Sequence, residues 1–491
     1  KAGYYTVLGN EKSILENGDS WGKTDYNFVY DSDWYDANDW QDKKTGQPFF
    51  AQIQLQGGKF RDAPVENPVN PADVDIPPYY PGDEVIRKDW AQYLNSVLYL
   101  DDQVKRITER LEMEGIADST IIFLFTDHGI SHLRGKQFLY DEGIQIPLIV
   151  HWPGFIDDGK RREELVSHID IAAASLHLAG IPVPEVMQGR SFYGKNDEPR
   201  EYIFAGRDRC DETVDVIRAL RTPKFKYIRN YFPFKPYAQH NQYKDGKKIM
   251  QHMRSLYENG ELKSETATYF YPLRAQEELY DLENDPHEMH NLASNPEYLN
   301  DLQNMQQLML EAMQSTNDLG FIPEPITEIL GKKYDNKYFI SKQSDFFSLQ
   351  NQCLETLSFD EENNLSALKT ALKDKEPAVR FWAAYGLGNL NNLADDVLSE
   401  LQEKLNDPSD AVKIAAARAL CKAGLTEPAL DILAENMSNQ NLITGMYAAL
   451  FTEDLDLELR QQIKPEIAAQ QDNPYNFTRR VINRMLGNME E

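Results

Sequence analysis

Apolar residues occur along this chain both as short continuous runs and as helical periods, and the two patterns predict different elements. The run from Thr120 to Phe125 contains no turn-forming residue, so it predicts a strand buried on both faces. Similar runs at 48–55 and 146–150 predict two further strands. Apolar positions between Val85 and Gly115 recur at helical spacing and predict a long amphipathic helix.

The segments that follow continue this alternation of strands and helices. A helix is expected over 168–180, where Gly180 and Pro182 end it. Strands are expected at 202–205, 214–220 and 227–232, the last two forming a β-ribbon. A Pro-, Asn- and Asp-rich loop spans 56–86, and loops of this length are usually functional or disordered. The alternation is typical of α/β proteins with an added α+β part.

The last third of the chain repeats itself. The segment 376–387 recurs as 409–420, a period of 33 residues, and a weaker third copy ends at 441–450. Periods of this size indicate stacked supersecondary units, and the pattern resembles HEAT-type repeats. We expect an α-solenoid over 345–491 that serves as a structural cap or as an arm for a protein partner.

Candidate chemistry follows the strand that ends at Phe125. Asp127 and His128 come directly after it, and Lys136 follows eight residues later, ahead of the strand at 146–150. Because ligands of open α/β sheets bind at the carboxyl ends of strands, this position predicts a site. A turn with a capping aspartate is the plain alternative for Asp127, His128 and Gly129 taken alone.

The stretch 120–153 resembles the sulfatase family of the alkaline-phosphatase superfamily, and so do 48–55, 166–171, 188–191 and 279–292 in that order. The resemblance covers about residues 1–310. It implies an α/β fold, an alkaline-phosphatase-like sandwich around a mostly parallel sheet, then an α+β subdomain and the α-solenoid. The expected parts are 1–200, 201–344 and 345–491.

The resemblance also implies roles for the residues near Phe125. Asp127 and His128 match a pair of metal ligands, and the expected cofactor is a divalent metal, Ca²⁺ by family. A histidine is less usual for Ca²⁺, which prefers oxygen, so the identity of the ion stays open. Lys136 matches the lysine that contacts sulfate and the leaving oxygen, with a solvent-exposed surface lysine as the alternative.

Other candidates come from the loops that follow the earlier strands. Lys23 matches the second family lysine, with Lys12 as its competitor, and Asp25 stands where the family has a histidine. Gln56 and Lys59 are expected to bind substrate. His132 is the nearest replacement for a missing general acid, or else a loop histidine without a role. Three arginines, Arg207, Arg209 and Arg218, either line a pocket for an anionic glycan or form structural ion pairs.

The nucleophile of the family is a formylglycine made from Cys or Ser in a Cys/Ser-x-Pro-x-Arg motif. Neither form of this motif occurs, and the three cysteines, Cys210, Cys353 and Cys421, lie in other contexts. We therefore expect an N-terminally truncated chain that lacks its nucleophile and is inactive alone. An odd number of spread cysteines also predicts no disulfide framework.

Composition limits the partners and the class of function. The 491 residues carry a formal net charge of −28, which argues against nucleic acid as a partner, and no apolar run is long enough to span a membrane. The expected function is a sulfuric ester hydrolase that cleaves sulfate from a sulfated carbohydrate or another sulfate ester, periplasmic or secreted by family resemblance. The alternatives are an inactive sulfatase-like scaffold or anion-binding protein with a helical interaction arm, and a phospho-ester hydrolase of the same superfamily.

Overall fold

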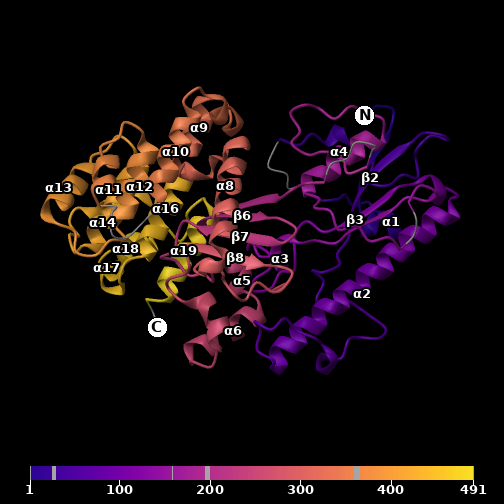
Figure 1. The fold of residues 1–491 in the computed structure, drawn as a ribbon, viewed down its shortest axis with the longest axis horizontal. Helices are drawn as coiled ribbons and strands as arrows, with labels where there is room; N and C mark the ends of the chain where they lie inside the picture. The colour runs from indigo at the N-terminus through magenta and orange to yellow at the C-terminus, as the bar shows by residue number, and fades with distance from the viewer. Residues whose placement is uncertain (1, 25–28, 157–158, 194–198, 359–364, 490–491) are drawn as a thin grey trace. The chain divides into compact units, whose positions relative to one another are not determined.

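The computed structural model describes residues 2–24, 29–156, 159–193, 199–358 and 365–489 (Figure 1). The chain forms two compact units. Unit 1 comprises Lys1–Ile203 and Gly246–Ala267, and unit 2 comprises Phe204–Asp245 and Thr268–Glu491. The expected division of the chain into three parts, 1–200, 201–344 and 345–491, is not tested by these two units and stays a prediction.

Unit 1 contains the first four strands and most of the early helices. Their bounds are β1 Tyr5–Asn10, α1 Glu11–Glu16, β2 Phe49–Gln54, α2 Glu84–Met113, β3 Ile122–Phe125, α3 Asp141–Ile144, β4 Leu148–His151, α4 His168–Leu178, α6 Lys248–Glu258 and α7 Ser264–Ala267. The predicted strands at 48–55, 120–125 and 146–150 and the helices at 85–115 and 168–180 are confirmed.

The sheets of unit 1 are small and mixed. β1 and β2 pair in parallel, with Tyr5 opposite Phe49. β3 and β4 pair antiparallel, with Phe125 opposite Leu148, so the expected parallel arrangement does not extend to this pair. The physical reason lies in the connection. A parallel pair needs a crossover of a dozen or more residues, usually a helix, whereas the only helix between β3 and β4 in the described chain is the four-residue α3.

The expectation that β3 is buried on both faces is also wrong. Its first three residues are half-buried, and the side chain of Phe125 is 42% exposed. Among the described residues β3 has one neighbouring strand, β4, so the sheet it belongs to has only two strands. A two-stranded sheet leaves much of each strand without cover.

Helix α2 is anchored at both ends to the first part of unit 1. Asp83 caps its start, because the carboxylate accepts a hydrogen bond from the Ile86 amide at 3.1 Å. Near its end Arg110 donates two hydrogen bonds to Asp39, at 2.7 and 2.8 Å. Leu111 joins Val7 in the hydrophobic core beneath β1. These contacts join α2 to β1 and to the segment before β2.

Unit 2 begins with a four-stranded sheet in the order β5-β6-β7-β8. The strands are β5 Ile203–Cys210, β6 Thr213–Arg221, β7 Phe225–Asn230 and β8 Glu277–Asp281. β6 and β7 pair antiparallel, with Ala219 opposite Ile228, which confirms the predicted β-ribbon. The turn between them closes where the Thr222 hydroxyl accepts a hydrogen bond from the Phe225 amide at 2.9 Å.

Helices make up the rest of unit 2 (Figure 1). Their bounds are α5 Gln242–Asp245, α8 Leu299–Ser315, α9 Glu324–Lys333, α10 Phe346–Leu357, α11 Leu365–Ala371, α12 Pro377–Leu387, α13 Asp395–Lys404, α14 Asp410–Lys422, α15 Ala429–Asn436, α16 Leu442–Glu453, α17 Leu457–Gln462, α18 Lys464–Ala468 and α19 Asn476–Gly487. The predicted helical C-terminal region is confirmed. Within the described residues no helix is both long and apolar enough to cross a membrane.

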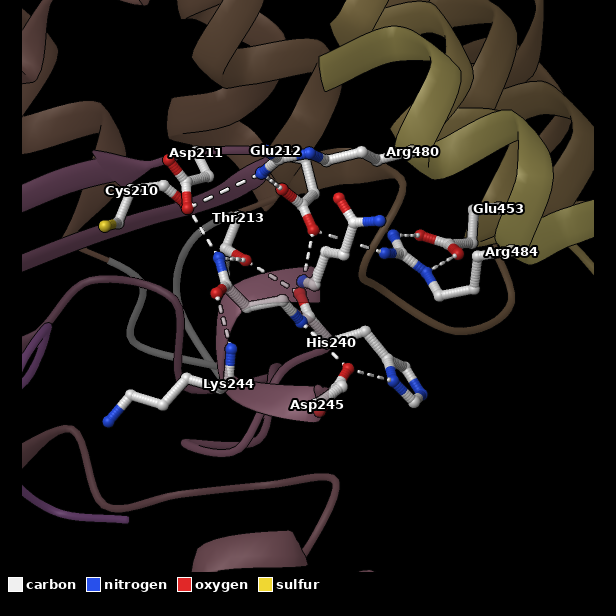
Figure 2. Close-up of polar contacts among 12 residues, drawn as sticks. Cys210, Asp211, Glu212, Thr213, His240, Lys244, Asp245, Glu453, Arg480 and Arg484 are labelled. Atoms are coloured by element: carbon white, nitrogen blue, oxygen red, sulfur yellow. Dashed lines mark hydrogen bonds and ion pairs between the residues drawn. The ribbon is translucent and has the colours of Figure 1, made fainter. Parts of the chain in front are cut away.

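The helical region is packed onto the sheet part of unit 2. Trp382 of α12 is almost fully buried; its indole nitrogen donates to the Phe321 carbonyl at 2.6 Å, and its ring packs edge-on against Phe232. Figure 2 shows a second anchor, where Arg480 of α19 donates to the buried carboxylate of Glu212 at 3.0 Å in the β5–β6 turn. The repeats are therefore integral to unit 2.

Candidate functional site

Five of the predicted site residues lie together at the end of β3. Asp127 and His128 follow the strand directly, Lys136 lies on the loop that leads to α3, and Lys59 lies on the loop after β2. The fifth, Lys23, follows α1. Burial and the charges of Lys23 and Lys136 lower the pKa of Lys59, which Asp127 opposes. The charges of these side chains therefore act on one another, although different loops carry them.

His128 has the hydrogen bonds of a metal ligand. Its Nδ1 lies 2.7 Å from the Gly129 carbonyl oxygen, to which it donates a proton. Nε2 is buried, takes part in no hydrogen bond and lies 3.5 Å from Asp127 Oδ1. Because the backbone carbonyl fixes the tautomer, Nε2 presents its lone pair toward the Asp127 carboxylate. Burial, with the charges of Lys136 and Lys59, lowers the pKa of His128 and keeps the ring neutral.

The Asp127–His128 pair fits a divalent cation as part of a ligand set. An unpaired imidazole nitrogen beside a carboxylate oxygen is a usual pair of donors. Among the described residues, however, no group of three or more His, Cys, Asp or Glu side chains is placed to hold a metal ion. Two donors are too few for Ca²⁺, which takes six to eight oxygens, so other ligands would have to complete the site.

The loop that carries Lys136 folds closely upon itself. The Lys136 amide donates to the Ile130 carbonyl at 2.7 Å, and the Gly129 amide donates to the Gly143 carbonyl at 2.9 Å. A Cβ atom at Gly135 would lie 1.7 Å from the Ile130 oxygen, so only glycine fits there. This closure sets the position of Lys136 relative to Asp127.

Aromatic side chains brace the same loop from outside. The guanidinium of buried Arg134 lies 4.4 Å from the centre of the Tyr79 ring and 4.1 Å from that of Tyr140. The Leu133 amide donates to the Tyr80 hydroxyl at 2.8 Å. The Pro-rich stretch of loop 56–86 thus supports the site loop. Sequence reasoning did not identify these residues, although Arg134 stands two positions before Lys136.

His132 is buried and hydrogen-bonded to α2. Its side chain has no exposed surface, and its Nε2 lies 2.7 Å from Asp89 Oδ2 on α2 and 3.1 Å from Arg61 Nη2. Burial raises the pKa of Asp89, but the hydrogen bond from His132 and the charge of Arg61 outweigh it and hold the pKa below its usual value. These contacts tie the site loop to α2, and the catalytic role of His132 stays a prediction.

The remaining predicted residues differ in how they are placed. Both Lys12 and Lys23 are exposed, and Lys23 is the one whose charge acts on Lys59. The side chain of Gln56 is exposed and has no hydrogen-bond partner among the described residues, and its role as a substrate ligand stays a prediction. Asp25 lies outside the described residues.

Two of the three candidate arginines form ion pairs within unit 2. Arg209 pairs with Glu324 through two hydrogen bonds, at 2.6 and 2.9 Å. Arg218 does the same with Asp318, at 2.5 and 2.8 Å. Arg207 is buried, with Asp215 as its strongest favourable charge. Of the two alternatives, structural ion pairs therefore describe Arg209 and Arg218.

Replacing Gly135 with alanine is expected to lower activity at the site by about tenfold or more, because displacing Lys136 by about 1 Å misplaces a positioned charge. Gly487, an exposed residue at the end of α19 with no positive φ and no atom within 4 Å of an added Cβ, provides a control by the same substitution. The measurement is kcat and KM for one substrate with both variants. An unchanged kcat in Gly135→Ala would show that the closed loop does not position Lys136.

Three protein families match different parts of this sequence. Residues 1–181 match the sulfatase family, and residues 128–269 match the C-terminal region of N-sulphoglucosamine sulphohydrolase. Residues 349–421 and 364–444 match HEAT repeats. The sulfatase matches include every residue of the group at the end of β3, and the HEAT matches fall on the helices of unit 2.

This sequence is also similar to individual sulfatases. An ulvan-active sulfatase of Formosa agariphila is 36% identical over 263 residues, which are 53% of this chain and 44% of that protein. The N-sulphoglucosamine sulphohydrolase of Homo sapiens is 25% identical over 266 residues, 51% of this chain and 52% of that protein. The chain spans about half the length of these relatives. A solved 2-O GAG sulfatase aligns with a TM-score of 0.40 at 16% identity, over 65% of this chain and 73% of that one.

Proposed function

We propose a function from one premise: this chain belongs to the sulfatase family. The proposed activity is hydrolysis of a sulfate ester on a sulfated carbohydrate at the end of β3. The observation that carries the proposal is the group of three lysines around Asp127 and His128, in which the charges of Lys23 and Lys136 lower the pKa of Lys59. Three mutually repelling cations held together are a ready site for an anion.

The lysines would bind and orient the sulfuryl group. Hydrolysis of a sulfate ester builds negative charge on the sulfuryl oxygens and on the leaving oxygen, and fixed cations stabilise that charge. The backbone of Lys136 is held by the closed loop, and its side chain would supply one ammonium group. Lys59 and Lys23 approach from the loops after β2 and α1. In a chain with a net charge of −28, this local excess of positive charge is what admits an anionic substrate.

Asp127 and His128 would hold the divalent metal, for which Ca²⁺ is the family expectation. When bound, such an ion neutralises charge on the substrate and lowers the pKa of a coordinated nucleophile. The His128 tautomer fixed by Gly129 supports this role, since it leaves Nε2 ready to bind without losing a proton. Formylglycine stays the proposed nucleophile, and none of the three cysteines stands in the motif that would form it.

The substrate class is proposed from the relatives. The Formosa agariphila protein is named for activity on ulvan, a sulfated polysaccharide, and the human protein for sulphoglucosamine. A sulfated carbohydrate is therefore the substrate we propose here. A periplasmic or secreted location belongs to the same proposal, because polymeric glycans are encountered outside the cytoplasm.

The test is release of inorganic sulfate, measured by ion chromatography, from ulvan and from p-nitrophenyl sulfate, with the protein produced from its whole gene. p-Nitrophenyl phosphate serves as the competing substrate. We expect sulfate release that Asp127→Ala abolishes. Asp118→Ala changes an exposed aspartate of unit 1 outside the site and should retain full activity.

Two results would contradict the proposal. Turnover of the phosphate ester without turnover of either sulfate ester would assign the chain to phospho-ester hydrolysis. Full sulfate release by Asp127→Ala would remove the carboxylate from the site. A measurement of bound metal in both variants, by atomic emission, separates loss of the ion from loss of the substrate.

A further inference from the structure

A second cluster of positive charge lies in unit 2, among the helical repeats. It consists of Arg418 and Lys422 on α14, Lys235 after β7, Asn389 after α12, and Asp454 at the end of α16. We refer to these five residues as the Arg418 cluster. None of them has a part in the site described for unit 1.

The cluster contains more cations than carboxylates. Arg418 Nε lies 3.0 Å from Asp454 Oδ2, and Lys235 Nζ lies 3.4 Å from Asp454 Oδ1. Asn389 Oδ1 accepts from Arg418 Nη2 at 3.1 Å and from Lys422 Nζ at 3.5 Å. Three cations thus share one carboxylate and one neutral amide oxygen.

Two further acids close to the cluster do not remove this excess. Glu453 is engaged by Arg484, with two hydrogen bonds at 2.6 and 2.7 Å. Asp456 acts on Lys422 through its charge, after Asp454. The three cations carry a charge of +3 and the carboxylates of Asp454 and Asp456 carry −2, so the net charge of the group is +1. A net positive group is unusual in a chain with a formal net charge of −28.

Arg418 is held rigidly by the repeat architecture. Tyr385 and Arg418 occupy the same position in two successive repeats, 33 residues apart, and Phe451 lies on α16, the next repeat helix. The Arg418 guanidinium carbon lies 4.6 Å from the Tyr385 ring centre and 5.6 Å from that of Phe451. The aromatic rings of the neighbouring repeats therefore fix the plane of the guanidinium.

One donor of this fixed guanidinium is unused. The Arg418 side chain is 3% exposed, and its Nη1 is buried without a hydrogen-bond partner. A buried charged donor without an acceptor costs free energy, so such an atom usually marks a place where a ligand or water supplies the acceptor. The ammonium groups of Lys235 and Lys422 are two further hydrogen-bond donors close to Arg418.

We propose that the Arg418 cluster is an accessory site that binds a sulfate group of a sulfated polysaccharide. The inference rests on the proposed function, which supplies a polymer with many sulfate groups. A sulfate oxyanion accepts hydrogen bonds from several directions, which matches one guanidinium donor with two ammonium groups. A sulfate that is not cleaved would be held here, and the site would raise affinity for the polymer without acting on a small ester.

The state of Lys422 is consistent with a site that gains an anion. Partial loss of hydration, together with the charges of Arg418 and Lys235, lowers the pKa of Lys422 to about 8, against the opposing charges of Asp454 and Asp456. Tyr385, whose pKa is raised by burial, also faces the cluster, and the charge of Glu453 acts on Lys235. A bound anion would favour protonated Lys422, so affinity should fall as pH rises from 7 to 9.5.

The test uses the full chain and dextran sulfate, with binding followed by isothermal titration calorimetry. Lys422→Gln and Lys235→Gln should each weaken binding by about tenfold, the scale of losing one hydrogen bond to a charged group. Lys375→Gln removes an 82% exposed lysine of the repeats outside the cluster and should change affinity by less than twofold. Hydrolysis of p-nitrophenyl sulfate should be unchanged in all three variants.

Further binding measurements identify the chemistry of the ligand and the role of Lys422. Unsulfated dextran should not bind, and polyglutamate should bind less tightly than dextran sulfate through the cluster. The wild-type affinity should fall between pH 7 and 9.5, whereas that of Lys422→Gln should not. The proposal is overturned if neither cluster variant weakens binding, or if Lys375→Gln weakens it equally. Cluster-dependent binding without hydrolysis of any sulfate ester would defeat the proposed function and leave the anion site standing.

Discussion

Replacing Lys136 with alanine is expected to reduce sulfate release by about 100-fold or more, the effect of removing one preorganised electrostatic contact from an active site. The closed loop holds this lysine through the hydrogen bond from its own amide to the Ile130 carbonyl at 2.7 Å. The backbone that carries the ammonium is therefore fixed before the substrate binds. Its loss removes stabilisation of charge that develops in the transition state, so kcat should fall more than KM rises.

The measurement is steady-state turnover of p-nitrophenyl sulfate. Lys105→Ala, which changes a lysine of α2 with a side chain that is 69% exposed, is the matched control and should behave as the wild type. Lys136→Arg should recover part of the activity, because it restores the charge with a different geometry. A decrease in turnover of less than twofold in Lys136→Ala would show that Lys136 is a surface lysine without a catalytic role.

Replacing Asp215 with alanine is expected to destabilise unit 2 by about 3–5 kcal/mol, the usual cost of leaving a buried charge without its partner. Both Asp215 and Arg274 have fully buried side chains, and Arg274 donates to both carboxylate oxygens. Burial raises the pKa of Asp215, but the charges of Arg274 and Arg207 outweigh it and keep the carboxylate ionised. Its removal leaves two guanidinium groups in the interior of unit 2.

Urea unfolding followed by circular dichroism measures this effect. Asp431→Ala, at an exposed position of α15, should shift the midpoint very little. A double variant in which leucine replaces Asp215 and methionine replaces Arg274 should recover part of the stability, because only Arg207 then lacks its counter-charge. An Asp215→Ala midpoint equal to that of Asp431→Ala would show that the pair does not stabilise unit 2.

Much of unit 1 could be predicted from sequence because its elements have strong local patterns. The run before Thr126 and the helical period from Val85 give β3 and α2 without knowledge of their neighbours. Asp127, His128 and Lys136 are close in sequence and follow one strand, so their proximity was predictable too. Lys23 and Lys59 required the family resemblance, because they belong to loops that only the fold brings together.

The features that were predicted wrongly, or not at all, depend on contacts between distant segments. The pairing direction of β3 and β4 depends on how the chain between them returns, which residue periodicity does not encode. The burial of His132 depends on Asp89, 43 positions earlier on α2. The period of 33 residues predicts stacked repeats, but Lys235, which completes the Arg418 cluster, comes from outside them.

The most direct test of the sulfate site is a crystal of the chain soaked in sodium selenate, with the anion located by anomalous scattering. Selenate has the shape and charge of sulfate. We expect a peak within about 3 Å, hydrogen-bonding distance, of the ammonium groups of Lys136 and Lys59, next to Asp127 and His128. A fully occupied selenate at the Arg418 cluster with no anion beside Lys136 would contradict the assignment of the end of β3 as the place where a sulfate group binds.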